Sequence, residues 1–143
     1  MNILFDTSVL VPALVDQLSN HPVCFSAFLT YTSENHTGCC STHALAECYS
    51  VLTALPLRRR ISPEEASRLV NESVVRHLSV IELDLEDYRN AVKAAADRGL
   101  ASGIVYDALH LAAARKASCD RILTYNINHF AALGATDITV ASP

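Results

Sequence analysis

Residues 2–8 read NILFDTS, a short apolar run that stops at an acidic residue followed by two hydroxyl side chains. The run Asn2–Phe5 has the length and composition of a buried strand, and Thr7 and Ser8 can cap a helix over Val9–Val15. A buried strand that leads directly into a helix is typical of an α/β protein, in which helices cover both faces of a parallel sheet.

The rest of the chain repeats this alternation of short apolar runs and longer amphipathic segments. Further strands are expected at Gly38–Ser41, Ser79–Leu83, Arg121–Leu123 and Asp137–Val140. Further helices are expected at Pro22–Tyr31, His43–Leu55, Ser62 to about His77, Glu86–Arg98 and Ile104–Ala117. No repeat or linker interrupts the pattern, and 143 residues are the size of one ordinary domain. We therefore expect a single domain over residues 1–143 with a central parallel sheet.

The composition argues against a disordered chain and against a broadly basic nucleic-acid-binding surface. Hydrophobic residues make up 50% and charged residues 18% of the sequence, so the chain can bury a core. With a net charge of −4, any binding of nucleic acid must use a local basic patch. The densest basic run, Arg58-Arg59-Arg60, could contact RNA phosphates or an acidic segment of a protein partner, or could be a solvated loop.

Neither a membrane segment nor a zinc–cysteine site is expected. The longest apolar run, Val9–Val15, falls far short of the ~20 residues that a bilayer-spanning helix needs. Asp6 interrupts the N-terminal apolar stretch, which argues against a signal peptide and favours a cytoplasmic protein. The five cysteines form no CxxC pair, and Cys39-Cys40 with His43 is poor support for zinc, so we expect buried, reduced thiols.

Four polar residues stand where the pattern would otherwise place buried apolar side chains. Asp6 and Asn126 follow the ends of two strands, while Glu47 and Asp107 lie on helices with little other charge. Ligands of open parallel sheets bind beyond the carboxyl ends of the strands. The segments around Glu47 and Asp107 offer no basic partner at helical spacing, and unpaired buried carboxylates are costly. A divalent cation held by Asp6, Glu47 and Asp107 would satisfy all three acids.

The chemistry of these side chains favours hydrolysis of a phosphodiester. Carboxylates are hard oxygen ligands suited to Mg²⁺ or Mn²⁺, and such sites polarise a phosphoryl oxygen and activate a bound water. Each residue alone has a simpler interpretation: Asp6 as a helix cap, Glu47 reaching solvent, Asp107 serving the helix dipole and Asn126 in a turn. Independent explanations at all four positions are less expected than one shared site.

Four motifs, in order along the chain, resemble those of the PIN-domain nucleases. They are Phe5-Asp6-Thr7-Ser8-Val9-Leu10, Ala46-Glu47, Tyr106-Asp107-Ala108-Leu109-His110-Leu111-Ala112 and Leu123-Thr124-Tyr125-Asn126-Ile127-Asn128-His129-Phe130. The size and motif order are most similar to the VapC-type toxins of bacterial and archaeal toxin–antitoxin pairs. The resemblance implies a three-layer α/β/α fold, a Mg²⁺- or Mn²⁺-dependent endoribonuclease, inhibition by a cognate antitoxin and homodimerisation.

The resemblance also assigns roles to individual residues. It makes Asp6, Glu47 and Asp107 the metal-binding acids and Asn126 a fourth catalytic position that is often Asp. Because asparagine removes one negative charge there, a second metal ion is less expected than the first.

Four further residues near these motifs have supporting or doubtful roles. Ser8 and Thr124 match positions that often orient the acids or a water molecule. His129 stands where many relatives have Asp and is not expected to be a metal ligand. His110, one helical turn after Asp107, is expected to be a core or supporting histidine rather than a catalytic base.

Two other functions stay open from the sequence alone. One is a PIN nuclease outside toxin–antitoxin systems, acting in RNA processing or on DNA. The other is a PIN-like binding module without catalysis, although the complete set of acids argues against it. A phosphatase of the haloacid dehalogenase type is excluded, because it needs a second Asp where Ser8 stands and a lysine in a late segment.

Overall fold

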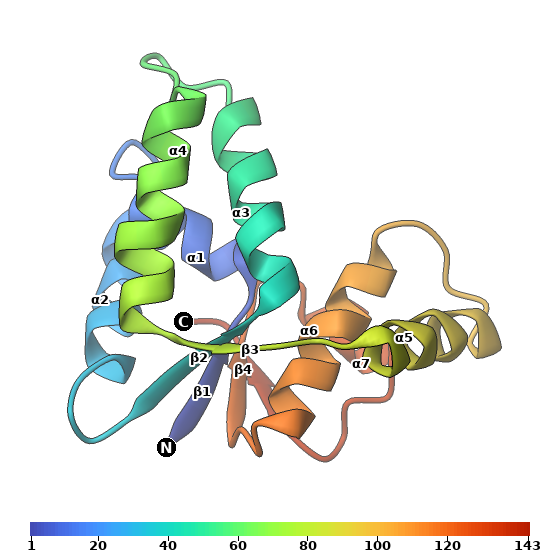
Figure 1. The fold of residues 1–143 in the computed structure, drawn as a ribbon. Helices are drawn as coiled ribbons and strands as arrows, with labels where there is room; N and C mark the ends of the chain where they lie inside the picture. The colour runs from blue at the N-terminus through green and yellow to red at the C-terminus, as the bar shows by residue number, and fades with distance from the viewer.

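Five parallel strands form the central sheet of the computed structural model, which describes residues 1–143. The strands lie in the order β3-β2-β1-β4-β5, so the first strand of the chain occupies the middle of the sheet (Figure 1). Their bounds are β1 Asn2–Phe5, β2 Thr37–Ser41, β3 Ser79–Ile81, β4 Arg121–Leu123 and β5 Thr139–Ala141. The expected parallel sheet is confirmed.

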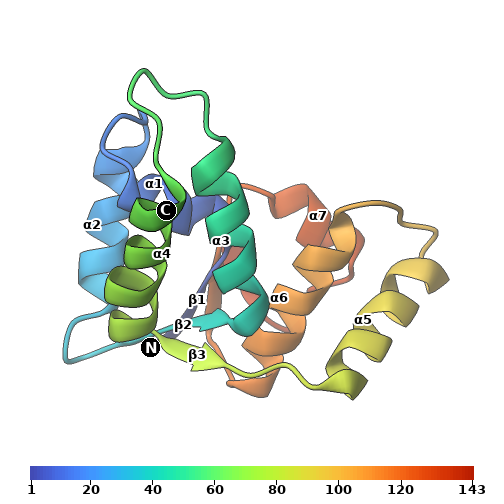
Figure 2. The ribbon, with the colours of Figure 1, turned by 45° about the horizontal axis from the view of Figure 1, so that its top comes forward.

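Helices cover both faces of the sheet, as Figures 1 and 2 show from two directions. One layer consists of α1 Thr7–Leu14, α2 His21–Tyr31, α3 Thr42–Ala54 and α4 Pro63–Leu69, which continues into the π-helical segment η1 Val70–Val75. The other layer consists of α5 Leu85–Asp97, α6 Ile104–Lys116 and α7 Ile127–Ala132. The three-layer α/β/α fold is therefore confirmed.

The alternating side chains of β1 divide the core between the two helical layers. Ile3 and Phe5 pack with the layer of α1 to α4, whereas Leu4 packs with the layer of α5 to α7. All three are fully buried, as expected for a central strand covered on both faces. A shift in register would exchange the two sets of side chains, so the packing fixes where β1 ends.

Helix capping follows the sequence pattern at two helices and departs from it at α1. Ser41 and Ser62 each accept the backbone N–H of the third residue after them and so cap α3 and α4. The expected capping of α1 by Thr7 or Ser8 is wrong, because the helix already begins at Thr7 and the Ser8 hydroxyl donates to Asp6. The Ser8 hydroxyl therefore binds the Asp6 carboxylate and does not cap the helix.

Two features of the helices were not expected from the sequence, although the other element boundaries agree within about two residues. The helix expected from Ser62 to about His77 changes at Val70–Val75 into a π-helical segment. The short helix α7 was not predicted from the sequence, because six residues are too few to show a helical period.

All five cysteines are free and buried, which confirms the expectation of core thiols. Burial raises the pKa of the Cys40 thiol to about 12, which keeps it protonated at neutral pH. No helix is both long enough and apolar enough to cross a membrane.

The carboxyl ends of β1 and β4 lie side by side and create the edge where the polar residues gather. Phe5 pairs with Leu123 in the parallel register, and the Asp6 N–H donates to the Leu123 carbonyl at 3.0 Å. Asp6 and Thr124 thus leave the sheet together, at the edge where ligands of parallel sheets bind.

Candidate active site

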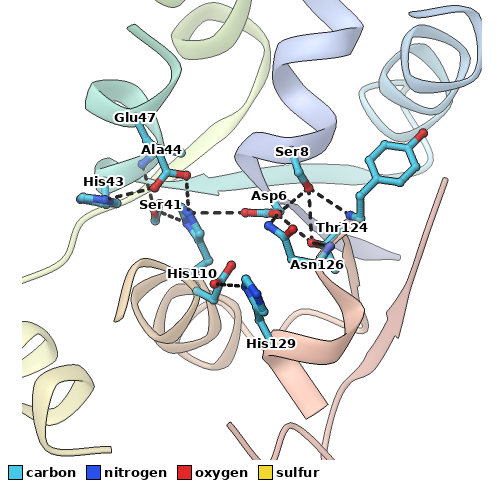
Figure 3. A network of polar contacts seen from close by, with 12 residues as sticks. Asp6, Ser8, Ser41, His43, Ala44, Glu47, His110, Thr124, Asn126 and His129 are labelled. Atoms are coloured by element: carbon cyan, nitrogen blue, oxygen red, sulfur yellow. Dashed lines mark hydrogen bonds and ion pairs between the residues drawn. The ribbon is translucent and has the colours of Figure 1, made fainter. Parts of the chain in front are cut away.

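Asp6 is held firmly at this edge, and its two carboxylate oxygens have different surroundings (Figure 3). Its Oδ2 accepts hydrogen bonds from Ser8 Oγ at 2.6 Å, Thr124 Oγ1 at 2.7 Å and Asn126 Nδ2 at 3.3 Å. Its Oδ1 lies 3.5 Å from His110 Nε2. Because neutral donors surround one oxygen, the carboxylate is fixed with the other facing the centre of the site.

Ser8 and Thr124 also attach the chain after β4 to this carboxylate. Ser8 Oγ accepts the Tyr125 N–H at 3.0 Å, and Thr124 Oγ1 accepts the Asn126 N–H at 2.8 Å. Each hydroxyl accepts from the backbone while it donates to Asp6, which fixes its orientation. The structure thus places both residues directly against the predicted metal-binding acid.

Glu47 and His110 approach Asp6 from different helices. Glu47 lies in the second turn of α3, and His110 lies in α6, one turn after Asp107. The fully buried His110 ring places Nε2 3.3 Å from Glu47 Oε1 and 3.5 Å from Asp6 Oδ1. Since both neighbours are carboxylates, Nε2 carries a proton and donates. Asp6, Glu47 and His110 offer ligand atoms within 4.8 Å of one another.

Ser41, at the end of β2, orients the opposite side of the His110 ring. Its Oγ lies 2.9 Å from His110 Nδ1 and accepts the Ala44 N–H at 3.1 Å. A hydroxyl can donate to a neutral imidazole or accept from a charged one, so the contact suits both protonation states. One buried hydroxyl therefore caps α3 and positions the histidine.

The charges of Glu47 and His110 stabilise each other. Burial raises the pKa of Glu47, but the His110 and His43 rings outweigh burial and lower that pKa below its usual range. Burial lowers the pKa of His110, but the nearby acids, Glu47 first, raise it above its usual value. The expectation that Glu47 has no basic partner at helical spacing is wrong, because His43 Nε2, four residues earlier, lies 3.3 Å from its Oε2.

Asp107 lies in the first turn of α6 and faces the same cavity as Glu47. His129 Nδ1 donates to its Oδ2 at 2.8 Å. Burial raises the pKa of Asp107, His129 opposes this rise, and the charge of Asp6 adds to it. The three acids therefore share one electrostatic site. The tightest cluster, however, contains His110 where the sequence predicted Asp107.

The contacts of Asn126 and His129 extend the site along α7. The Asn126 amide nitrogen donates to Asp6, so this side chain supports the acid as a neutral donor. His129, which is not expected to be a metal ligand, follows Asn126 by one helical turn and contacts Asp107. The spacing of three residues between Asn126 and His129 would place both side chains on one face of a helix, but the sequence did not predict a helix in this segment.

A cavity of about 630 Å³ opens beside the acids, and we call it the site cavity. Its polar lining includes Glu47, Asp107, Asn126 and His129. Its apolar lining includes Val11, Pro12, Leu18, Val51 and Leu55. The basic run Arg58-Arg59-Arg60 does not line it, and Arg59 instead borders a separate cavity of about 410 Å³.

The available donor atoms fit a divalent metal ion. Glu47 Oε2 is buried and receives no hydrogen bond, because the His43 ring 3.3 Å away is not aligned to donate one, and Asp6 Oδ1 faces the His110 ring at 3.5 Å. Carboxylate oxygens are the hard ligands that Mg²⁺ and Mn²⁺ prefer, whereas an imidazole suits softer metals. The acids, and not the histidine, are therefore the residues suited to hold such an ion.

Known proteins share this sequence pattern and this architecture. The PIN domain family matches residues 3–135. The chain is 36% identical over 104 residues to Ribonuclease VapC27 of Mycobacterium tuberculosis, a match that covers 73% of this chain and 70% of that protein. Its fold is similar to that of Mycobacterium tuberculosis VapC20, a sarcin-ricin loop cleaving toxin, with a TM-score of 0.72, 16% identity and coverage of 91% and 94% of the two chains. It is also similar to VapBC2 from Rickettsia felis, solved bound to a promoter DNA fragment, with a TM-score of 0.70, 16% identity and coverage of 100% and 99%.

Proposed function

The chain belongs to the PIN-domain family, and from this premise we propose that it is a metal-dependent endoribonuclease, the toxin of a type II toxin–antitoxin pair. The ribonuclease relative supports RNA as the substrate, and the toxin VapC20 supports the toxin role. One observation carries the proposal. Glu47 and Asp107 line one open cavity at the carboxyl edge of a parallel sheet, and Asp6 lies beside it, sharing His110 Nε2 with Glu47 and close enough to Asp107 for its charge to raise the pKa of that acid.

Asp6, Glu47 and Asp107 are the residues that would hold the ion, which we propose is Mg²⁺ or Mn²⁺. When bound, such an ion polarises a phosphoryl oxygen and lowers the pKa of a coordinated water. Asn126 would contribute as a fourth site residue, without the charge that would favour a second ion.

The chain's own residues prepare this site. Ser8, Thr124 and Asn126 hold Asp6 in one orientation, so its ligand oxygen needs little rearrangement. His110 lies between the carboxylates of Asp6 and Glu47 and so reduces the electrostatic repulsion between them.

His129 occupies the outer side of Asp107. Its side chain is half exposed, and it lines the site cavity while its Nδ1–H donates to Asp107. It thus orients this carboxylate from the side on which a substrate would approach.

We further propose that a cognate antitoxin inhibits the enzyme and that the chain forms a homodimer. The likeness to VapBC2 and the toxin VapC20 supports the first proposal, and the resemblance to VapC-type toxins implies the second. The exposed run Arg58-Arg59-Arg60 is available for RNA or for an acidic antitoxin segment.

The test is cleavage of structured RNA by the purified protein freed of any antitoxin. Cleavage that requires Mg²⁺ or Mn²⁺, stops with EDTA and is lost in Asp6→Asn would support the proposal. Undiminished cleavage in EDTA would contradict the metal mechanism, and preference for DNA would favour the non-toxin nuclease. RNA binding without any cleavage would favour a binding module.

A further inference from the structure

Tyr106 is a large aromatic residue exposed beside the proposed catalytic acids. It immediately precedes Asp107 on α6, and it lines the site cavity. Its side chain is 46% exposed, while Asp107 and Ala108 after it are buried. An aromatic ring that contributes to a cavity wall instead of the core is available for contact with a ligand.

One face of the Tyr106 ring is already supported. The ring stacks on His43 with 4.7 Å between centroids and 27° between planes. His43 in turn lies 3.3 Å from Glu47, so the stack is attached to the acid cluster. Since the imidazole covers one face, the exposed surface of Tyr106 comprises the opposite face and the ring edge. A preoriented ring loses little conformational freedom when a ligand stacks on it.

The lining of the site cavity matches the two parts of a nucleotide. The carboxylates Glu47 and Asp107, with a cation, suit a phosphate group, and Tyr106 beside them suits a planar base. Proteins that bind single-stranded RNA commonly stack bases on aromatic side chains of this kind.

We propose that Tyr106 is the platform on which the base adjoining the scissile phosphate stacks, which makes it a specificity-determining residue. This inference rests on the proposed ribonuclease function and extends it to the substrate: the cut strand is unpaired at that nucleotide, because a base must leave its helix to stack on a side chain.

The experiment compares wild type, Tyr106→Leu and Tyr106→Phe on a short single-stranded RNA that the wild type cuts at one position. Loss of the stack raises KM roughly 5- to 150-fold in Tyr106→Leu, with a much smaller change in Tyr106→Phe. The matched control is Tyr88→Leu, since Tyr88 is 40% exposed on α5 and does not line the site cavity. This control should leave KM unchanged.

A series of RNAs, each lacking one base near the cut, identifies the stacked nucleotide. Removal of that base should raise KM for the wild type but not for Tyr106→Leu, since the two changes remove the same contact. The Mg²⁺-induced rise in melting temperature should be the same in both proteins, because the acids are intact.

Three results would overturn the inference. One is the same dependence on base removal in wild type and Tyr106→Leu. Another is an equal KM increase in Tyr106→Phe and Tyr106→Leu. The third is a loss of the Mg²⁺ response in Tyr106→Leu with KM unchanged, which would show that the ring only supports His43. A wild-type protein that neither binds nor cuts RNA would overturn the proposed function, and this inference with it.

Discussion

Replacing Ser41 with alanine should destabilise the protein far more than the loss of an ordinary helix cap. Its hydroxyl is fully buried and makes two contacts, to the Ala44 N–H and to His110 Nδ1. Loss of an N-cap costs about 1 kcal/mol, and a buried polar atom left without a partner costs about 1–3 kcal/mol. The free energy of unfolding should therefore fall by about 2–4 kcal/mol. This corresponds to roughly 6–20 °C in melting temperature for a chain of this size.

The matched control for this measurement is Ser62→Ala. Ser62 caps α4 through the same bond to a backbone N–H, but it is exposed and contacts no buried histidine. Its replacement should cost about 1 kcal/mol, or about 3–5 °C. Thermal unfolding of both variants by circular dichroism at pH 7 isolates the contribution of the histidine contact. A loss in Ser41→Ala no greater than that in Ser62→Ala would refute the reasoning.

Three further predictions concern the acids and the basic run. Mg²⁺ or Mn²⁺ at tenfold over its dissociation constant should stabilise the protein by about 1.4 kcal/mol, or about 4–7 °C, and the effect should be larger at pH 7.5 than at pH 5. A full response surviving in Asp6→Asn would place the ion elsewhere. Because the pKa of Asp107 is raised by burial, the folded state holds its proton longer, and the metal-free protein loses stability as pH rises through the unfolded pKa of about 3.9 and then the folded pKa. Asp107→Asn should therefore gain in melting temperature relative to wild type between pH 4 and pH 7, and a relative decrease would contradict the assigned shift. Replacing Arg58, Arg59 and Arg60 with alanine should leave the melting temperature nearly unchanged. It should weaken the binding of RNA or of the antitoxin and flatten the salt dependence of that binding. Unchanged affinity and salt slope for both partners would indicate a solvated loop.

The sheet and the acids could be predicted because their signals are local. The apolar run Asn2–Phe5 ends at a carboxylate, and Leu123 is followed within three residues by Asn126, so both polar groups had to lie at a strand end. Parallel strands bring such ends to one edge whatever the detailed packing.

The histidine contacts could not be predicted with the same certainty, because they depend on how helices cross. His110 meets Glu47 across 63 residues of sequence, at the place where α6 passes α3. His129 meets Asp107 only because α7 forms, and that helix is too short to show a period. The pairing of His43 with Glu47 was visible in the spacing, since residues four apart on a helix are neighbours.

The position of β1 in the middle of the sheet has a consequence for protein synthesis. Asp6 is translated before its donor Asn126, which lies 120 residues later in the chain. At about 5–20 residues per second, translation separates the two by about 6–24 s. Until β4 has been made, β1 lacks one of its two neighbours, and the carboxylate lacks the two donors that follow β4. The growing chain therefore cannot assemble the proposed site before β4 and Asn126 have been translated.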